Sequence, residues 1–235
     1  MWAEVLRDSP LLGSLSEGER ATVQALAGRF LQRCRVVGAH GFEPEPALRA
    51  RVAAEACTLL LGLRDGLEAY RAVRELVLYP SGFHVTQRWT DEDGVAHERE
   101  AQLAGEAWQE GPVILARDEV ESPDAGFNVV VHEFAHVLDA GNGVVNGFPA
   151  IGDAALRARW PRVFQAAFED LQRAEERGLA GPIDPYALED PGEFFAVASE
   201  TFFTDPYALA DDWPEVYDAL SAYYAQATIT RFRRA

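Results

Sequence analysis

The chain has 235 residues, which is long enough for one large domain with a buried core. Its formal net charge is −17, from 38 acidic and 21 basic residues. A surface this acidic repels nucleic acid phosphates and anionic lipids, so we expect no direct contact with nucleic acid or membranes. A peptide or protein with basic groups remains the expected class of partner.

Two cysteines, Cys34 and Cys57, lie in helix-like segments and show no metal-ligand spacing. We therefore expect two free buried thiols rather than a disulfide, which fits a reducing compartment. Residues 1–16 lack the basic start and the apolar stretch of a signal peptide, and no apolar run is long enough for a membrane span. Together these features predict a cytoplasmic protein.

The first third of the chain is predicted to be helical. Ser16 and Glu19 have the spacing of a capping box, which marks the start of a helix. Pro46, before an Ala-rich stretch, and Asp65 mark two further starts. The expected helices cover residues 16–31, 46–62 and 65–76.

Short β-like runs follow, separated by segments rich in Pro, Gly and Asp, and helical patterns then resume. This order predicts an α+β fold with a small sheet, mixed or mostly antiparallel. We predict a single domain over residues 1–235, with 1–75 as a helical part packed on it. The strands are expected at 76–79, 83–89, 95–103 and 113–117, and the later helices at 126–140, 160–177, 191–203 and 213–226.

Residues 132–136 read His-Glu-Phe-Ala-His and match the pattern H-E-x-x-H. Positions i and i+4 of a helix share one face, so His132 and His136 can bind the same ion. Glu133 lies beside them, where it can act as general base toward a water molecule. Zinc suits two imidazoles and one carboxylate, with a fourth position left for water. The pattern predicts one Zn²⁺ per chain.

The alternative is that these two histidines are only core residues. The predicted helix is apolar on nearly every side and should be buried, so polar groups inside it need a partner that uses them. This favours the metal site. The other histidines, His40, His84 and His97, lie in polar loop-like or strand-like settings, and we assign them no metal role.

The third ligand must come from elsewhere in the chain. Glu193 and Glu200 are seven residues apart, so they share one face of a largely buried helix. Glu193 also follows Asp190 with capping-box spacing, so spacing alone leaves ligation and capping open. Glu200 is either a ligand or a brace for a ligating histidine, and Asp139 is a second candidate for such a brace.

Tyr186 precedes Glu193 by seven residues and can reach the metal from a loop. Its phenol could donate a hydrogen bond to the oxyanion that forms during hydrolysis. The sequence alone favours an aromatic packing role for this residue instead.

Three motifs in this order resemble the Mlc titration factor A family, a group of bacterial cytosolic zinc peptidases. They are the metal helix at 132–139, Glu-Phe-Phe-Ala-Val-Ala-Ser-Glu at 193–200, and Gly-Glu-Ala-Trp at 105–108 before Gly-Pro-Val at 111–113. The family is similar to the catalytic domain of anthrax lethal factor, a gluzincin. The resemblance therefore implies a zincin-like fold.

The resemblance also implies roles for individual residues. It makes Glu193 the third zinc ligand and places Tyr186 at the metal. It implies aminopeptidase-like activity, and it suggests a transcriptional repressor, Mlc, as a partner in the control of sugar uptake.

Two functions therefore compete. The first is peptide hydrolysis, with the substrate extended along an edge strand, for which residues 113–117 are our prediction. The second is regulation by binding a repressor, with weak or incidental peptidase activity.

Overall fold

The computed structural model describes residues 1–81, 83–90, 96–103, 105–107, 111–121 and 127–232. Side chains are described in the ranges 1–81, 111–121 and 127–232. The α-helices are α1 (Trp2–Asp8), α2 (Pro10–Ser14), α3 (Glu17–Arg33), α4 (Pro46–Thr58), α5 (Arg117–Glu121), α6 (Val129–Asp139), α7 (Ala154–Glu176), α8 (Pro191–Thr204), α9 (Pro206–Asp212) and α10 (Pro214–Tyr224). Four short 3-10 helices are η1 (Gly66–Tyr70), η2 (Ala140–Asn142), η3 (Pro185–Leu188) and η4 (Thr228–Arg231).

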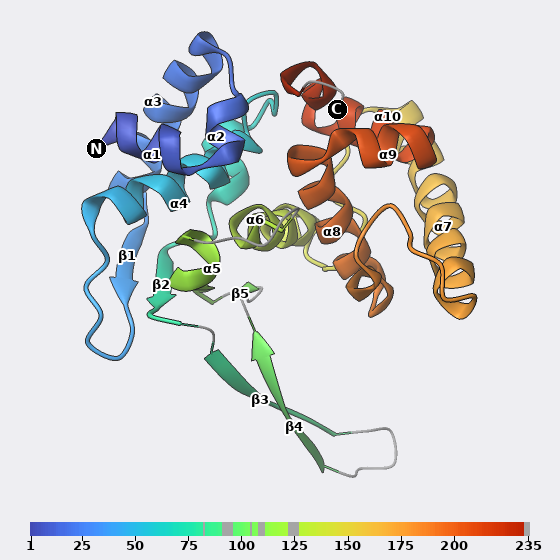
Figure 1. Cartoon of the computed structure of the whole chain (residues 1–235), viewed down its shortest axis with the longest axis horizontal. Coiled ribbons are helices and arrows are strands. Elements are labelled where there is room, and N and C mark those ends of the chain that lie inside the picture. The colour runs from blue at the N-terminus through green and yellow to red at the C-terminus, as the bar shows by residue number, and fades with distance from the viewer. Residues whose placement is uncertain (82, 91–95, 104, 108–110, 122–126, 233–235) are drawn as a thin grey trace.

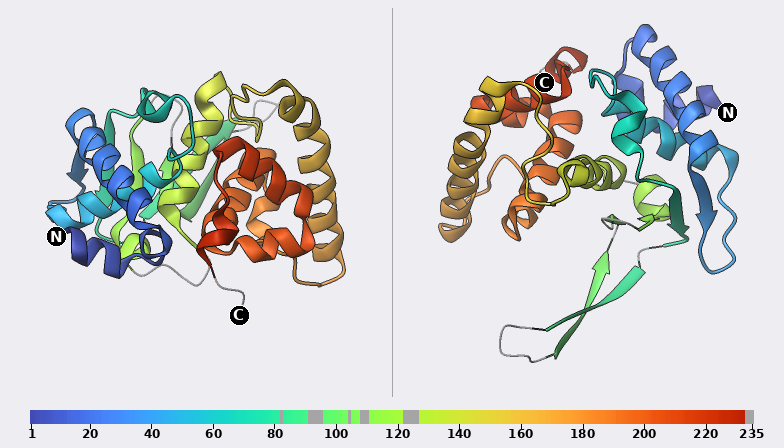
Figure 2. Two further views of the ribbon diagram at one scale, coloured as in Figure 1. Left: turned by 90° about the horizontal axis from the view of Figure 1, so that it is seen from above. Right: turned by 180° about the vertical axis from the view of Figure 1, so that it is seen from behind.

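The helices form two groups, with α6 between them. Helices α1–α4 lie on one side of α6, and α7–α10 lie on the other (Figures 1 and 2). Helix α6 packs on α8 from the second group and on α4 and the sheet from the first. Within the described residues, no helix combines the length and apolar character needed to cross a bilayer.

The helix that starts after Ser16 is confirmed. The Ser16 hydroxyl accepts a hydrogen bond from the Glu19 amide at 3.3 Å, and the Glu19 carboxylate accepts one from the Ser16 amide at 2.8 Å. The same carboxylate also accepts from Arg231, so it links the start of α3 to the C-terminal segment.

The helix predicted at 65–76 is wrong. Gly66 has φ +49°, outside the right-handed helical region, and only the 3-10 turn η1 forms around it. The chain then enters strand β2 (Glu75–Tyr79), which is held on both sides by neighbouring strands. Pairing between distant segments therefore decides the conformation here.

The strands are β1 (Arg35–Gly38), β2, β3 (Phe83–Thr90), β4 (Ala96–Leu103), β5 (Gly105–Ala107) and β6 (Val113–Ala116). Four of them form a mixed sheet in the order β1-β2-β6-β5. Strands β1, β2 and β6 are parallel, and only β5 runs antiparallel. Strands β3 and β4 form a separate antiparallel hairpin that projects from the body (Figure 1).

The α+β class is confirmed. The sheet is mixed, which was one of the two expected arrangements, and the mostly antiparallel alternative is wrong. Parallel neighbours need a crossover connection, and α4 supplies it between β1 and β2. Local patterns reveal strands but not their partners, so this topology was hidden in the sequence. The predicted edge strand is also wrong. Strand β6 lies between β2 and β5, so β5 forms that edge.

Four α-helices were absent from the sequence prediction: α1, α2, α5 and α9. They have seven, five, five and seven residues. Helices of one to two turns contain too few positions to show a 3.6-residue apolar period. The local signals were proline at the first turn of α2 and α9, and Ser9 as the N-cap of α2.

Both cysteines are buried free thiols, as predicted. Cys34 follows the end of α3, and Cys57 lies inside α4. Burial raises the pKa of each thiol to about 12, so both stay protonated at neutral pH.

The loop after α6 packs directly on the start of α8. Gly147 has φ +72°, and a Cβ there would lie 2.2 Å from the carbonyl oxygen of Pro191. The backbone amide of Gly147 donates to Asp139 at 2.6 Å, and its carbonyl accepts from the Trp160 indole at 2.8 Å. The close approach therefore needs a residue with no side chain.

We expect Gly147→Ala to destabilise the fold measurably. Alanine at positive φ costs about 1–2 kcal/mol, and the overlap with Pro191 adds about 1–3 kcal/mol. The matched control is Gly178→Ala, because Gly178 has φ +66° and open space around its Cβ position. Urea unfolding of both variants is the measurement. Equal losses would show that contact with Pro191 does not matter.

Candidate metal centre

Helices α6 and α8 bring three potential ligands together. The Nε2 atoms of His132 and His136 lie 3.3 Å apart. The Oε2 atom of Glu193, in the first turn of α8, lies 3.1 Å from His132 and 3.4 Å from His136. In the part of the chain with described side chains, this is the group of His, Cys, Asp and Glu residues whose geometry suits a metal ion.

These distances fit one tetrahedral ion. Ligand atoms about 2.0–2.1 Å from zinc at tetrahedral angles lie about 3.3 Å from each other. All three measured separations, 3.1, 3.3 and 3.4 Å, are close to that value. Two imidazoles and one carboxylate are also a donor set that zinc uses in catalytic sites, where a fourth position stays open.

The charge around the cluster favours a cation. Burial alone lowers the pKa of His132, but contacts with Glu193 and Glu200 reverse this and raise it to about 10. Burial likewise opposes ionisation of Glu193, yet the two imidazoles lower its pKa to about 2. The buried carboxylates around His132 therefore favour a positive charge at this place.

The position of the Glu193 carboxylate bears on whether this residue caps α8 or faces the histidines. Asp190 caps α8 alone, because its Oδ1 atom accepts from the amides of Gly192 at 2.7 Å and Glu193 at 3.0 Å. The Glu193 carboxylate faces the two imidazoles. Its position therefore agrees with ligation, and the start of α8 has its cap without it.

Glu133 and Tyr186 lie beside the cluster. Glu133 is 4% exposed, and its negative charge acts on both His132 and Tyr186. The Tyr186 ring lies 6.1 Å from the His132 ring, and the residue is 39% exposed. Burial, and then the charge of Glu193, raises the pKa of Tyr186, so its phenol keeps its proton.

Glu200 lies behind His132, on the side away from Glu193. Its Oε2 atom is 3.4 Å from Nδ1 of His132, and its Oε1 atom accepts a hydrogen bond from the backbone N–H of Asn128 at 2.5 Å. The sequence left two roles open for this residue, a ligand or a residue that orients a ligating histidine. Its position beside Nδ1 of His132 fits the second role. Asn128 itself was missed, although asparagine before an apolar helix is a typical N-cap signal.

Asp139 contacts the following loop. Its Oδ2 atom accepts from the amides of Asn146 at 2.8 Å and Gly147 at 2.6 Å. Burial raises the pKa of Asp139. Among the described side chains, none forms a hydrogen bond with Nδ1 of His136. Asp139 is therefore placed to hold the loop that packs on α8.

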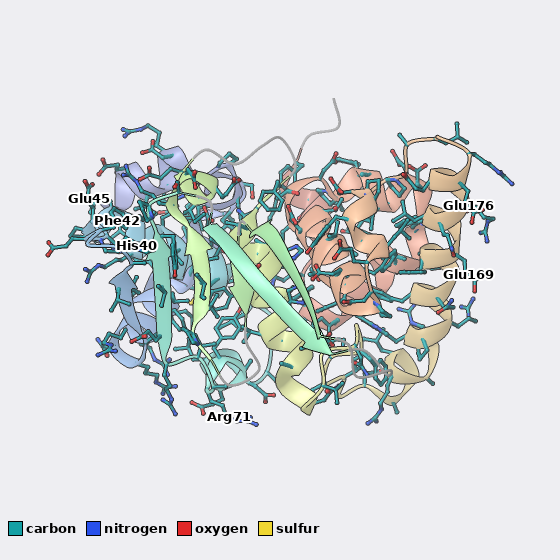
Figure 3. The ribbon with its side chains drawn as sticks, turned by 90° about the horizontal axis from the view of Figure 1, so that it is seen from below. His40, Phe42, Glu45, Arg71, Glu169 and Glu176 are labelled. Atoms are coloured by element: carbon teal, nitrogen blue, oxygen red, sulfur yellow. The ribbon has the colours of Figure 1, made fainter. Side chains whose placement is uncertain are left out.

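The remaining histidines are not part of this cluster as far as the structure describes them. His40 lies near Phe42 at the end of the molecule formed by the N-terminal helices (Figure 3), and its ring packs edge-on against Tyr79. The side chains of His84 and His97 lie outside the described part of the chain.

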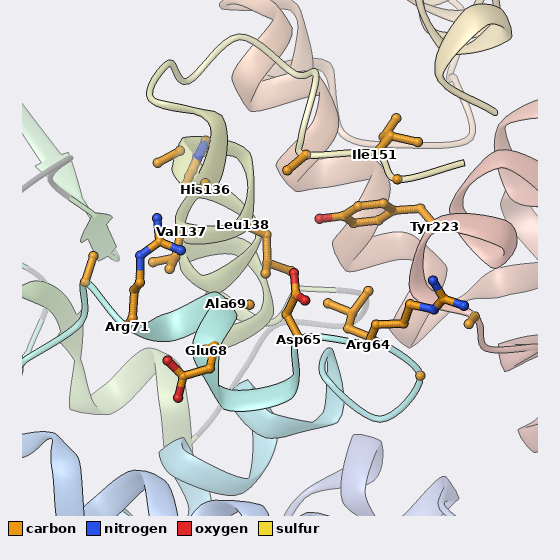
Figure 4. Close-up of a pocket in the computed structure, with 18 of the residues that line it drawn as sticks. Arg64, Asp65, Glu68, Ala69, Arg71, His136, Val137, Leu138, Ile151 and Tyr223 are labelled. Atoms are coloured by element: carbon orange, nitrogen blue, oxygen red, sulfur yellow. The ribbon is translucent and has the colours of Figure 1, made fainter. Parts of the chain in front are cut away.

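A cavity of about 1020 Å³ opens beside the C-terminal end of α6. It reaches the cluster through His136, so it flanks the centre rather than containing it. Figure 4 shows Arg71 and Val137 on one side of it and Tyr223 on the other. A volume of this size can hold several side chains of a bound peptide.

Comparison with known proteins agrees with this arrangement. A model of the family described as glucose-regulated metallo-peptidase M90 matches residues 1–225. Mlc titration factor A of Escherichia fergusonii is 38% identical over an alignment of 239 positions. The alignment covers 99% of this chain and 88% of that protein. The protein of that name from Cronobacter sakazakii is 39% identical over 233 residues, 95% of this chain and 85% of the relative. The chain therefore belongs to the glucose-regulated metallo-peptidase M90 family, and the resemblance indicated by its motifs is confirmed.

Proposed function

We propose that the chain is a zinc-dependent peptidase in which His132, His136 and Glu193 hold the ion. The observation that carries this proposal is the convergence of two imidazole nitrogens and one carboxylate oxygen within 3.1–3.4 Å of each other. Family membership supports a metallopeptidase, and the donor set supports zinc.

The chain's own groups would carry out the proton transfers. Zinc, when bound, would lower the pKa of a water molecule and polarise the scissile carbonyl. The Glu133 carboxylate, beside the ligands on α6, would accept a proton from that water and pass it to the leaving amine. Tyr186 keeps its proton and would donate a hydrogen bond to the oxyanion.

The substrate would lie along the edge strand β5. This strand has one free side in the described sheet, and it packs on α6, which carries the histidines. An extended peptide can add to such an edge through backbone hydrogen bonds. The cavity beside His136 would then receive substrate side chains. We infer an aminopeptidase-like mode from the family resemblance.

The remaining predictions belong to the same proposal. We propose a zincin-like, gluzincin-type fold, with one domain over 1–235 and a helical part at 1–75. Two helices with the proposed ligands, α6 and α8, beside a small sheet are compatible with it. A cytoplasmic location fits the two free thiols. The acidic surface continues to argue against direct binding to nucleic acid.

A second candidate function is binding of a transcriptional repressor. It is favoured by the name of the relatives, Mlc titration factor A. Their similarity to this chain extends over nearly its whole length. The two functions can coexist. A variant that lacks hydrolytic activity but still binds the repressor would separate them.

Hydrolysis by the purified full chain tests the proposal. We expect the zinc-loaded protein to cleave aminoacyl chromogenic substrates and to lose this activity when a chelator removes the ion. The double variant His132→Ala/His136→Ala should lose both the zinc and the activity. A double variant with native zinc content would place the site elsewhere. A zinc-loaded native chain that cleaves neither these substrates nor longer peptides would favour the second candidate function.

A further inference from the structure

A series of buried polar side chains joins the candidate metal centre to helix α4. It begins with Arg51 and Glu55, whose side chains are 7% and 1% exposed and whose Nε and Oε1 atoms lie 2.9 Å apart. The other buried residues of α4 are almost all apolar. Replacing a buried ion pair with apolar side chains is often neutral or stabilising, so stability alone explains this pair poorly.

Asn128 connects the pair to α6. Its Nδ2 atom donates to the second oxygen of Glu55 at 3.3 Å, while its Oδ1 atom accepts from the Val131 amide at 2.9 Å and caps the helix. Aspartate or serine would cap α6 as well as asparagine does. Only asparagine combines the cap with an amide donor that reaches Glu55.

Glu200 continues the series to the metal ligand. It accepts from the backbone N–H of Asn128 at 2.5 Å with one oxygen, and its other oxygen lies 3.4 Å from Nδ1 of His132. A carboxylate on the outer nitrogen of a ligating histidine fixes the tautomer and orientation of the ring. The full series is Arg51, Glu55, Asn128, Glu200 and His132.

We propose that Arg51 and Glu55 are positioning residues for the metal centre. They hold the Asn128 side chain in place, and the backbone N–H of the same residue in turn holds Glu200 against His132. Helix α4 packs on α6, so the N-terminal helical part contributes to the geometry of the centre. This inference rests on the proposed metal site.

The test replaces the pair with apolar side chains of similar size, as Arg51→Met/Glu55→Leu in the full chain. We expect the variant to fold with a modest fall in melting temperature, because the buried charges leave together while the Asn128 side-chain amide loses its acceptor. Zinc affinity, measured by competition with a chromogenic chelator, should fall on the order of tenfold. The visible absorption spectrum of the cobalt-substituted protein should change, since it reports the coordination geometry.

The control is Arg117→Met/Glu121→Leu, an exposed Arg–Glu pair with the same i,i+4 spacing on α5 that is outside the series. It should leave zinc affinity and the cobalt spectrum unchanged. A folded Arg51/Glu55 variant with native affinity and spectrum would overturn the positioning role. A native chain that binds no zinc would overturn the metal site itself, which is a separate result.

A second variant provides the same test if the double variant does not fold. Asn128→Ser keeps a capping oxygen for α6 but lacks the amide donor to Glu55. We expect a loss of zinc affinity in the same direction. Unchanged affinity in this variant would also overturn the proposal.

Discussion

Glu133→Gln should abolish most hydrolytic activity while the protein keeps its zinc. Glutamine has the size of glutamate but cannot accept the proton from water, and loss of a general base costs on the order of 10²–10⁴-fold in kcat. Glu133 is buried beside His132 and is not one of the three converging ligands, so zinc content should not change. Steady-state kinetics and metal analysis on the same preparation are the measurements.

A charge control accompanies that variant. Glu189 is exposed, and its charge also acts on Tyr186 from the loop before α8. Glu189→Gln removes one negative charge near the centre without touching the proposed base, and it should keep near-native kcat. If Glu133→Gln retains activity, Glu133 is not the base, and repressor binding becomes the leading function.

Glu193→Gln should weaken zinc binding more than any other single carboxylate change in the centre. The substitution replaces an anionic oxygen, 3.1 Å from Nε2 of His132, with a neutral amide. Glu200→Gln leaves three ligands in place and should cost on the order of 10–100-fold in affinity, as expected for a residue that braces a ligand. Competitive zinc titration of both variants is the measurement, with their melting temperatures alongside.

The ranking of these two losses decides between the roles. If Glu193 served only to cap α8, glutamine would replace it without loss of zinc affinity or stability. Near-native affinity in the Glu193 variant with a severe loss in the Glu200 variant would mean that the wrong carboxylate has been assigned.

The parts of the centre that are local in the chain could be predicted from the sequence. His132 and His136 share a helix face because of their spacing, and the structure brings them together at 3.3 Å. The start of α8 was predicted from Asp190 and Pro191. Spacing could not separate ligation from capping at Glu193, because both roles put glutamate at the same position. The family resemblance was needed for that choice.

The parts that depend on distant segments could not be predicted. The sequence left the sheet as mixed or mostly antiparallel, because strand patterns do not reveal which neighbour each strand pairs with. The contact between Asn128 and Glu55 joins α6 to α4, and only the folded structure shows it. An Arg and a Glu four residues apart in an Ala-rich helix were the available signal.

The two helices that carry the proposed ligands, α6 and α8, come from separate stretches of the chain with α7 between them. An ion held by both would act as a reversible cross-link that exists only in the folded state. Such a ligand stabilises the fold by about 2.7 kcal/mol when its free concentration is a hundred times Kd. Resistance of the protein to heat and to proteolysis would then follow the supply of metal, and its lifetime in a cell would vary with metal availability as well as with its sequence.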